Sequence, residues 1–542
     1  MTTHYDAVIV GGGFAGVRSL WETRQLGLSA RVLEAGTSVG GTWYWNRYPG
    51  ARTDSEAWTY CFSFDDKLCQ EWNWTERFPG QPEVEAYFNH AVDSLDLRKD
   101  IQFTTRVNGC TYDEASNTWT VSTTDGETFT CRYLISATGL LHLALKPPFP
   151  GLDSFRGEWM MTAKWPKEPV DFAGKKVVLI GTGATGVQLI PVVARDAAQL
   201  TVLQRTPNYV VPTRNHALEP NHLAEIKRNY DKIWAQTDVQ VFAFAMDAAN
   251  RMSTDVPKDQ WNQVFDAGWE AGGFRFLFET FDDLLVNTEV NEAAAEYVRN
   301  KIRAIVKDPA TADLLCPTYY YGGKRPPMGT HYYESFNREN VKLVSVANNA
   351  ITDVTETGVR LADGTVHEAD VIVFALGFDA MTGALAQMNV RGTDGRTLQE
   401  KWNPEPATFM GITVDGYPNF FMLSGPQSPF ANIPVVIDKS VKFIGGAIRK
   451  AQSVGADVIE PTAEAASAYN EHCKMLLDFN TIIKSGTSQH SWFLGANVEG
   501  KSQSAVYFYF GGAAGFFGEL NGVMEKDFEG LSFSKHADKA VV

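Results

Sequence analysis

The chain has 542 residues, of which 44% are hydrophobic and 12% aromatic. Because single hydrophobic cores stop growing at roughly 250–300 residues, this length predicts two or three domains. Its 48 Lys and Arg residues are outnumbered by 64 Asp and Glu residues, which gives a formal net charge of −16. This acidic balance argues against nucleic acid or an anionic membrane as the main partner.

The cysteines and the apolar segments bear on the cellular compartment. Six cysteines are spread thinly, without the close spacing of a redox pair or a metal site. We therefore expect reduced thiols, no metal and a cytoplasmic monomer. The strand-like YDAVIV follows Met1 almost at once, so we expect no signal peptide. The most apolar run, SAVYFYFGGAAGFFG, is too short and glycine-rich to span a bilayer.

The first predicted unit is DAVIVGGGFAGVRSLWETRQLGLSARVLEAG, a strand, a glycine turn, a helix and a second strand. Its G-x-G-x-x-G pattern permits the turn, lets backbone approach a pyrophosphate and packs helix against strand. Glu34 ends the second strand, where a carboxylate would hydrogen-bond ribose hydroxyls. The unit predicts a dinucleotide site, against the alternative of an ordinary strand–helix turn. The expected contacts are Gly11, Gly13, Phe14, Ala15, Gly16 and Glu34.

A second unit of the same kind is GKKVVLIGTGATGVQLIPVVARDAAQLTVLQRTP. Its second strand ends in Arg205 and Thr206, with no acid. An arginine at this position suits a 2′-phosphate, so the unit should prefer NADP(H) to NAD(H). Pro207 fixes a turn there, and the alternative is that Arg205 is a solvated surface charge. The other expected contacts are Gly181, Thr182, Gly183, Ala184, Thr185, Gly186 and Gln188.

Two nucleotide units of unlike charge preference suggest one FAD and one NADPH. SATGL and FALGFDA each resemble a strand that ends in a glycine turn, and we expect the chain to cross between the two domains there. GYPNFFMLSGPQSPFAN is a further strand and turn, suited to holding backbone against a flavin ring. The sequence therefore predicts an α/β protein in which one Rossmann-like domain is inserted within another.

Residues 212–320 change to helical periodicity and predict a helical insertion, most of which we expect to have no part in catalysis. Asp308 and Pro309 are expected to end its last helix. The FAD-binding domain is predicted over 1–140 and 378–542, and the NADP-binding domain over 141–211 and 321–377.

Two more segments concentrate reactive side chains. YGGKRPPMGTHYY holds Lys324 and Arg325 between glycine and proline pairs, and a stiffened basic pair suits an anion better than a solvated turn does. GGTWYWNRYPGARTD carries broad aromatic side chains and ends in Asp54. Core packing explains two or three of the aromatics, but it does not explain an acid beside the dinucleotide loop.

Together these motifs resemble type I, or class B, flavin-dependent Baeyer–Villiger monooxygenases, the group of the cyclohexanone and phenylacetone monooxygenases, over essentially the whole chain. One family fingerprint is matched at Gly41, Trp43, Tyr48, Pro49, Gly50 and Asp54. The other is matched in FRGEWMMTAKWP at Phe155, Gly157, Trp165 and Pro166. Met161 stands where the family has a histidine, and Leu376 where it usually has threonine.

The resemblance implies an enzyme that uses FAD, NADPH and O2 to oxidise ketones to esters or lactones, through a flavin peroxide and a tetrahedral adduct. Sulfide oxidation would be a side activity. A cation near the flavin would favour the deprotonated peroxide and stabilise the developing oxyanion. Arg325 matches the family's active-site arginine, and Asp54 the acid that orients it. Lys324 joins Arg205 and Thr206 as a binder of the NADP 2′-phosphate.

The resemblance also implies contacts outside the glycine loops. Further cofactor contacts are Gly41, Thr42, Trp43, Tyr48, Asp54 and Trp492. Trp492 matches a loop residue that covers NADP, and a packed surface aromatic is the alternative. The candidates for the ketone pocket are Pro429, Phe430, Asn432 and Ile433. FRGEWMMTAKWP should fix the linker between the domains, where Met161 fills the volume of the histidine without its hydrogen bonds.

Three other classes of flavoprotein share some of these features. A disulfide reductase needs a redox-active cysteine pair, for which Cys61 and Cys69 are poorly spaced. An N-hydroxylating or sulfur-oxidising monooxygenase would use a protonated peroxide and does not need an Arg–Asp pair. A non-catalytic NADPH-sensing flavoprotein would explain the two departures from the family motifs as decay. Intact Arg325 and Asp54 argue against it, because a mere binder has no use for oxyanion stabilisation.

Overall fold

The computed structural model describes residues 3–485 and 490–536. Its largest sheet has the strand order β17-β4-β5-β6-β1-β2-β3, and β18 pairs with β6 in addition. β17 and β18 come from a later part of the chain than the strands of the second sheet, which is described below. The strands are β1 Thr3–Val10, β2 Ala30–Leu33, β3 Ile101–Gln102, β4 Val107–Asp113, β5 Thr118–Thr123, β6 Thr128–Ser136, β17 Val390–Arg391 and β18 Phe420–Met422.

The first glycine unit forms the middle of this sheet. β1 pairs in parallel with both β2 and β6, and its residues Ala7–Val10 are buried, as a central strand covered on both faces requires. Helix α1 (Phe14–Gln25) follows the glycine turn and packs against the long helix α15 (Ile433–Val454). Between these helices Arg18 donates from Nε to Oδ1 of Asp438 at 2.8 Å.

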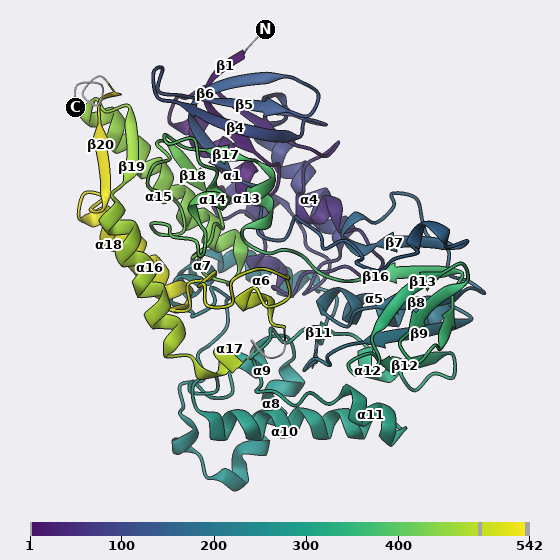
Figure 1. Cartoon of the computed structure of the whole chain (residues 1–542). Helices are drawn as coiled ribbons and strands as arrows, with labels where there is room; N and C mark the ends of the chain where they lie inside the picture. Colours follow the sequence, from purple (N-terminus) through teal and green to yellow (C-terminus); the bar gives the residue numbers. More distant parts are fainter. Residues whose placement is uncertain (1–2, 486–489, 537–542) are drawn as a thin grey trace.

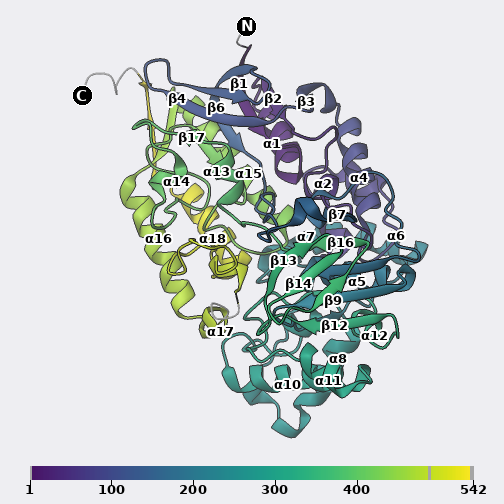
Figure 2. The same cartoon turned by 45° about the vertical axis from the view of Figure 1, so that its right-hand side comes forward.

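The second glycine unit forms a separate five-stranded parallel sheet of order β12-β9-β8-β16-β7. A small antiparallel sheet, β13-β14-β15, lies beside it. Figures 1 and 2 show the first sheet at the top of the molecule and the second at the lower right. The elements are β7 Glu158–Met161, β8 Lys176–Ile180, α5 Ala184–Asp196, β9 Gln199–Gln204, α12 Tyr332–Ser335, β12 Val341–Ser345, β13 Ile351–Thr355, β14 Gly358–Leu361, β15 Val366–Glu368 and β16 Val371–Phe374.

The helical insertion leaves and rejoins the second unit at a two-strand pair. That pair is β10 Val211–Pro212 with β11 Met328–Gly329, and the helices are α6 Pro220–Arg228, α7 Tyr230–Val239, α8 Trp261–Ala271, α9 Arg275–Phe278, α10 Thr288–Ile305 and α11 Pro309–Leu315. Helices α8 to α11 lie at the bottom of the molecule in Figure 1, whereas α6 and α7 lie at mid-height. One prediction is wrong here. Asp308 begins α11 as its N-cap, accepting from the backbone N–H of Thr311, because aspartate and proline also suit a helix start.

Most of the remaining helices lie around the first sheet, whereas α17 (Thr481–Ser485) lies lower in the molecule (Figures 1 and 2). The others are α2 Thr42–Trp45, α3 Asp66–Glu71, α4 Gln81–Ser94, α13 Gly383–Gln387, α14 Leu398–Lys401, α16 Ala463–Asp478 and α18 Gly512–Glu525, with the antiparallel pair β19 Val458–Pro461 and β20 Leu531–Ser534. Helices α15, α16 and α18 form the left flank in Figure 1. The predicted α/β class with two Rossmann-like units is confirmed.

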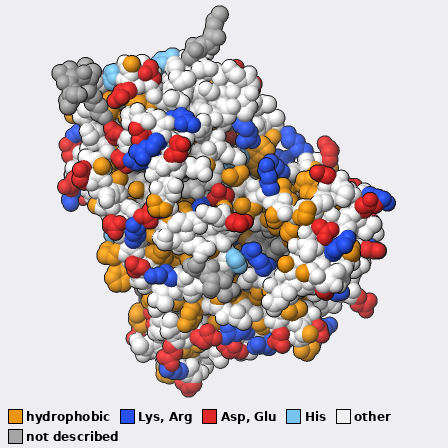
Figure 3. Space-filling view, in the orientation of Figure 1, with side chains coloured by type: hydrophobic (Ala, Val, Ile, Leu, Met, Phe, Trp, Pro, Cys, Tyr) orange, Lys and Arg blue, Asp and Glu red, His pale blue; other side chains and the backbone are white. Residues whose placement is uncertain are grey.

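The surface and the thiols agree with the composition. On the face drawn in Figure 3, acidic and basic side chains are interspersed over both the upper and the lower half. Within residues 3–485 and 490–536, no helix is long and apolar enough to cross a membrane. The same residues contain no group of three or more side chains that could hold a metal ion. All six cysteines are buried free thiols.

Candidate active site

The two glycine loops have the same local geometry. Gly11 has φ +109°, and a Cβ there would lie 2.5 Å from the carbonyl oxygen of Ala137. Gly181 has φ +111°, and its Cβ would lie 2.4 Å from the carbonyl oxygen of Ala375. Both positions therefore exclude any other residue, since this backbone region and this approach to the neighbouring strand tolerate no side chain. The predicted crossings, SATGL and FALGFDA, are the segments that touch the two loops.

The third glycine of each motif holds the helix against its own turn. A Cβ on Gly16 would lie 1.8 Å from the carbonyl oxygen of Gly11, and one on Gly186 would lie 2.2 Å from that of Gly181. The N-termini of α1 and α5 consequently point their free N–H groups out of the loop, where an anion is stabilised. This donor set fits the pyrophosphates of two dinucleotides.

Glu34 lies at the edge of the first loop with an exposed fraction of only 4%. Its two carboxylate oxygens accept hydrogen bonds from the backbone N–H groups of Gly12 and Gly36, each at 2.6 Å. Burial raises the pKa of Glu34, although these two hydrogen bonds act in the opposite direction. The structure thus fixes the carboxylate at the end of β2, where a ribose would lie.

A pair of cations lies at the corresponding edge of the second loop. Burial, together with repulsion by Arg205, lowers the pKa of Lys324 to about 8. Among the ion pairs of residues 3–485 and 490–536, none involves Arg205 or Lys324. Two neighbouring cations without an acid form an anion site, which fits the 2′-phosphate of NADP. Thr206 lies beside them, and its carbonyl oxygen accepts from Oγ1 of Thr182 at 3.2 Å.

Arg325 and Asp54 form an ion pair that joins two distant parts of the chain. Nη1 of Arg325 donates to Oδ2 of Asp54 across 271 residues of sequence. The side chains have exposed fractions of 17% and 36%, so the pair is partly shielded from water but open on one side. A guanidinium cannot lose its proton at physiological pH. The guanidinium of Arg325 therefore places a positive charge beside the cavity described below, with Asp54 as its counter-ion.

The loop that precedes Asp54 is docked on helix α5 of the second unit. Tyr48 donates through its hydroxyl to Oε1 of Gln188 at 2.8 Å, and Nε2 of Gln188 donates to the carbonyl oxygen of Arg52 at 3.1 Å. A Cβ on Gly50 would lie 2.6 Å from the carbonyl oxygen of Gln188, so the close approach requires glycine. Burial raises the pKa of Tyr48 to about 12, which keeps its hydroxyl a donor.

One cavity of about 2290 Å³ brings these parts together. The predicted site residues on its wall are Gly11, Gly13, Phe14, Ala15, Glu34, Gly41, Thr42, Trp43, Tyr48, Asp54, Gly181, Thr182, Gly183, Ala184, Thr185, Gln188, Arg205, Thr206, Lys324, Arg325, Phe430, Ile433 and Trp492. Gly16 and Gly186 lie behind the wall, where they pack the helices. The cavity is therefore shared by both dinucleotide units and by the ion pair.

Two predicted pocket residues do not lie on the wall. Asn432 is buried and donates from Nδ2 to the carbonyl oxygen of Thr59 at 2.9 Å, at the start of α15. Pro429 is buried and forms a bridge with Tyr509. Both residues hold the loop in place, while their neighbours Phe430 and Ile433 face the cavity. The sequence pointed to a loop that reaches the cavity, but it could not tell which residues of this irregular loop face it.

The helical insertion contributes an aromatic wall that the sequence analysis missed. This wall comprises Phe242, Phe244, Phe274, Leu277 and Phe278, which line the same cavity. The rings of Phe242 and Phe278 lie 4.7 Å apart. The available signal was the density of phenylalanine in VFAF and GGFRFLFETF, which surface helices do not need.

Trp492 and the two departures from the family pattern also lie on the cavity wall. The Trp492 ring contacts that of Phe430 edge-on, with the centroids 5.2 Å apart. Met161 pairs with Phe374 in the register of β7 and β16, and Leu376 follows two residues later. Met161 and Leu376 pack against the same apolar cluster, so the first departure lies at the end of an edge strand rather than in a free linker.

Comparisons with known proteins agree with this arrangement. Residues 8–289 match the family described as "Pyridine nucleotide-disulphide oxidoreductase". The chain is 41% identical to phenazine N-monooxygenase PhzNO1 of Lysobacter antibioticus, over 99% of this chain and 98% of that protein. It is 40% identical to a Baeyer–Villiger monooxygenase of Pseudooceanicola batsensis, over 99% of this chain and 97% of the relative.

A solved structure extends the likeness to three dimensions. Cyclohexanone monooxygenase from Rhodococcus sp. Phi1, bound to NADP+, superposes with a TM-score of 0.95 at 39% identity and covers 99% of this chain and 100% of its own. The chain belongs to the Baeyer–Villiger monooxygenases. As a member of that family it is an FAD- and NADP-dependent monooxygenase, of the class that oxidises ketones to esters or lactones. The predicted family, cofactors and reaction class are confirmed.

Proposed function

We propose that Arg325 and Asp54 are the catalytic residues for the oxidation of a ketone in this Baeyer–Villiger monooxygenase. The observation that supports the proposal is their position on a cavity shared by both dinucleotide loops. FAD, when bound in this cavity, would supply the chemistry that activates O2 after reduction by NADPH. Arg325 offers a fixed positive charge to the oxygen atoms that become negative during the reaction, and Asp54 orients the guanidinium. The charge is preorganised, so no rearrangement is needed when the reaction occurs.

The remaining residues have cofactor and substrate roles in this proposal. The first glycine loop and Glu34 hold FAD, whereas the second loop, Arg205, Thr206 and Lys324 hold NADPH. Trp492 covers the cavity from the side of Phe430. The aromatic wall, together with Phe430 and Ile433, gives the ketone an apolar surface and excludes water from the reacting atoms.

The boundaries and the cellular setting are also proposals. The FAD-binding domain extends over residues 1–140 and 378–542, and the NADP-binding domain over 141–211 and 321–377. The helical insertion, residues 212–320, separates the two parts of the NADP-binding domain. The membership of the two sheets supports this division. The enzyme acts on small molecules in the cytoplasm as a monomer, and the six free thiols support a reducing compartment.

A second activity is favoured by one observation. The 41% identical relative is a phenazine N-monooxygenase, which oxidises a heteroatom rather than a carbonyl. The aromatic wall suits an aromatic heterocycle, since such rings stack or pack edge-on with phenylalanine. We therefore propose oxidation of sulfides or ring nitrogens as an additional activity of the same cavity.

The test is a panel of linear, cyclic and aryl ketones with NADPH, followed by product analysis for the native enzyme and Arg325→Ala. We expect ester or lactone from the native enzyme, while Arg325→Ala still oxidises NADPH and forms ester at least about 100-fold more slowly. Full ester production by the variant would refute the assigned role. A sulfide and an aromatic N-heterocycle complete the panel, and absence of their oxides would remove the second activity.

A further inference from the structure

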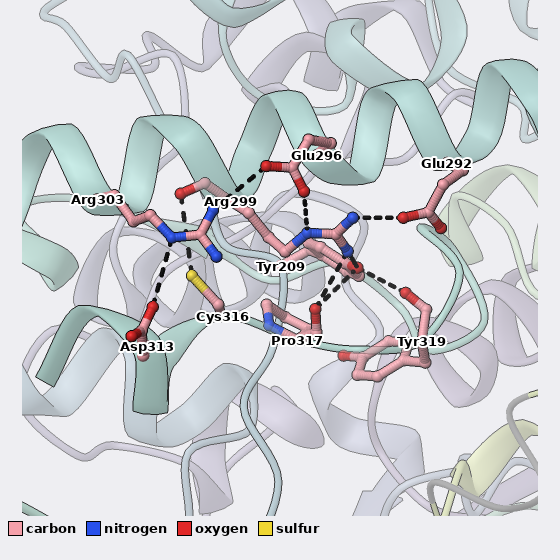
Figure 4. Close-up of polar contacts among 9 residues, drawn as sticks. All are labelled: Tyr209, Glu292, Glu296, Arg299, Arg303, Asp313, Cys316, Pro317 and Tyr319. Atoms are coloured by element: carbon pink, nitrogen blue, oxygen red, sulfur yellow. Dashed lines mark hydrogen bonds and ion pairs between the residues drawn. The ribbon is translucent and has the colours of Figure 1, made fainter. Parts of the chain in front are cut away.

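A buried hydrogen-bond network runs from helix α10 through Tyr209 to Tyr319, close to the second glycine loop (Figure 4). Arg299 of α10 has an exposed side-chain fraction of 13%, although its helix runs along the surface. Its Nε donates to Oε2 of Glu296 at 2.7 Å, and its Nη2 donates to Glu292. Its Nη1 turns inward and donates to the hydroxyl of Tyr209 at 3.1 Å. The guanidinium is thus held by two acids on one side, and on the other its Nη1 also donates to the carbonyl oxygen of Pro317 at 3.3 Å.

Tyr209 connects Arg299 to Tyr319, in the segment that contains Lys324. Its side chain is only 1% exposed, and its hydroxyl donates to the carbonyl oxygen of Tyr319 at 2.5 Å. The Nζ of Lys324 lies over the Tyr319 ring, 5.9 Å from its centroid. A cation above an aromatic face is attracted to it, so the position of this ring helps to set the position of the ammonium group.

Tyr319 also reaches the edge that carries Arg205. Its hydroxyl donates to the carbonyl oxygen of Pro207 at 3.2 Å and to Oδ1 of Asn208 at 3.1 Å. Asn208 in turn donates from Nδ2 to the carbonyl oxygen of Thr182, in the glycine loop, at 2.7 Å. One continuous network therefore joins α10, the Lys324 segment, the 205–208 edge and the glycine loop.

We infer that Arg299 is a positioning residue for NADPH: through Tyr209 and Tyr319, it holds Lys324 and the 205–208 edge in the geometry that binds the 2′-phosphate. The inference rests on the proposed phosphate role of Arg205 and Lys324. It gives α10, which has no residue on the cavity wall, a part in cofactor selection. Since the two cations address only the 2′-phosphate, their displacement weakens NADPH binding and leaves NADH binding unchanged.

The experiment measures KM and kcat of the holoenzyme with NADPH and with NADH for Arg299→Met, which keeps the aliphatic volume and removes the guanidinium. Residues outside a ligand site change coupling by between about twofold and thirtyfold, and we expect the KM for NADPH to rise about fivefold. The kcat at saturating NADPH and the KM for NADH should stay unchanged. A loss of folded protein would lower the apparent kcat with both cofactors and leave both KM values unchanged, so a rise in the KM for NADPH alone separates positioning from a structural defect.

The chain offers a matched control one turn further along the same helix. Arg303 pairs with Glu296 at 3.2 Å and with Asp313 at 3.4 Å, and no dashed line joins it to Tyr209 in Figure 4. Arg303→Met removes the same charge from α10 and should leave the ratio of kcat/KM for NADPH to that for NADH unchanged. An equal fall of that ratio in both variants would show a general electrostatic effect and overturn the inference.

A second variant keeps the test valid if Arg299→Met fails to fold. Tyr209→Phe removes only the hydroxyl that links Arg299 to Tyr319, and it should also raise the KM for NADPH alone. Lys324→Ala serves as the reference for the phosphate site, with adenosine 2′,5′-bisphosphate and 5′-AMP as binding probes. If Lys324→Ala lowers the NADPH preference and the other two variants do not, the inference is wrong. If Lys324→Ala has no effect either, the phosphate assignment falls and the inference with it.

Discussion

The neighbouring cations Arg325 and Lys324 differ in their surroundings, because Arg325 is paired with Asp54 whereas no ion pair of residues 3–485 and 490–536 involves Lys324. Burial and the charge of Arg205 lower the pKa of Lys324 to about 8, from a usual value near 10.5. The ammonium is therefore fully charged below about pH 7 and is lost as pH rises through about 8. A bound phosphate raises the pKa again, so NADPH binding takes up a proton in this range.

This titration predicts a pH-dependent KM for NADPH. Above pH 8 only the shrinking protonated fraction of Lys324 binds the phosphate, so the KM should rise by up to about tenfold per pH unit. Measurements from pH 6.5 to 9.5 with NADPH and with NADH check this, and the NADH curve should lack the rise. Lys324→Arg cannot deprotonate in this range and should flatten the NADPH curve. An unchanged rise in that variant would assign the titration to another group.

The presence of methionine instead of the family's histidine at position 161 leads to a second prediction, for the variant Met161→His. Met161 packs in an apolar cluster at the end of β7, where an imidazole would be partly buried without a polar partner. Met161→His should therefore lower the free energy of unfolding by about 1–3 kcal/mol and leave the product unchanged. Chemical denaturation and product analysis check the two parts. A change from an inert to an active enzyme would instead mark the native chain as a decayed member of the family.

At the scale of elements, the Asp54 loop is fixed by ion pairs on both sides. Glu56, two residues after Asp54, has a side chain that is only 1% exposed and pairs with Arg77 at 2.8 Å and with Arg275 at 3.1 Å. Arg275 belongs to α9, which also supplies Leu277 and Phe278 to the cavity wall. The Asp54 loop and the aromatic wall are thus joined at the carboxylate of Glu56.

The buried position of Glu56 predicts a large loss of stability in Glu56→Gln. Arg77, whose side chain is 7% exposed, would keep a buried charge without its counter-charge, at a cost of about 3–5 kcal/mol. Glu76→Gln is the matched control on the other side of the same loop, because its pair with Arg52 is 26% and 40% exposed and should contribute under about 1 kcal/mol. Urea denaturation of the two variants compares these costs. Similar values for both would contradict the argument from burial.

The elements differ in how far the sequence could predict them. Each glycine unit is local, because the strand, the turn and the helix that meet one phosphate lie within about 30 residues, and both were predicted. Arg325 and Asp54 could be paired only through the family resemblance. Arg275 and the five residues of the aromatic wall were missed, since their direction is set by how the insertion packs on the rest of the chain. Asn432 was wrongly placed on the pocket wall, because its side chain donates to the carbonyl oxygen of Thr59, a residue far away in sequence.

At the scale of the whole molecule, the reactive parts come from both domains. Asp54 and Glu34 belong to the part of the chain that builds the first sheet, whereas Arg325 and Lys324 follow the insertion and precede the last strands of the second. The ion pair exists only when the two domains hold this relative position. Docking of the Tyr48–Arg52 stretch on Gln188 of α5 favours that position through side-chain hydrogen bonds.

The return of β18 to the first sheet has a consequence for biosynthesis. β18 pairs with β6 at residues 134–136, beyond the stretch that β5 covers, so this end of the β6 edge stays open until residue 422 has been made. The second sheet needs nothing beyond Phe374 and can close earlier, while the first is incomplete. During synthesis on the ribosome, we therefore expect the inserted domain to fold before the domain that encloses it. The sheet that supports the FAD site is completed last.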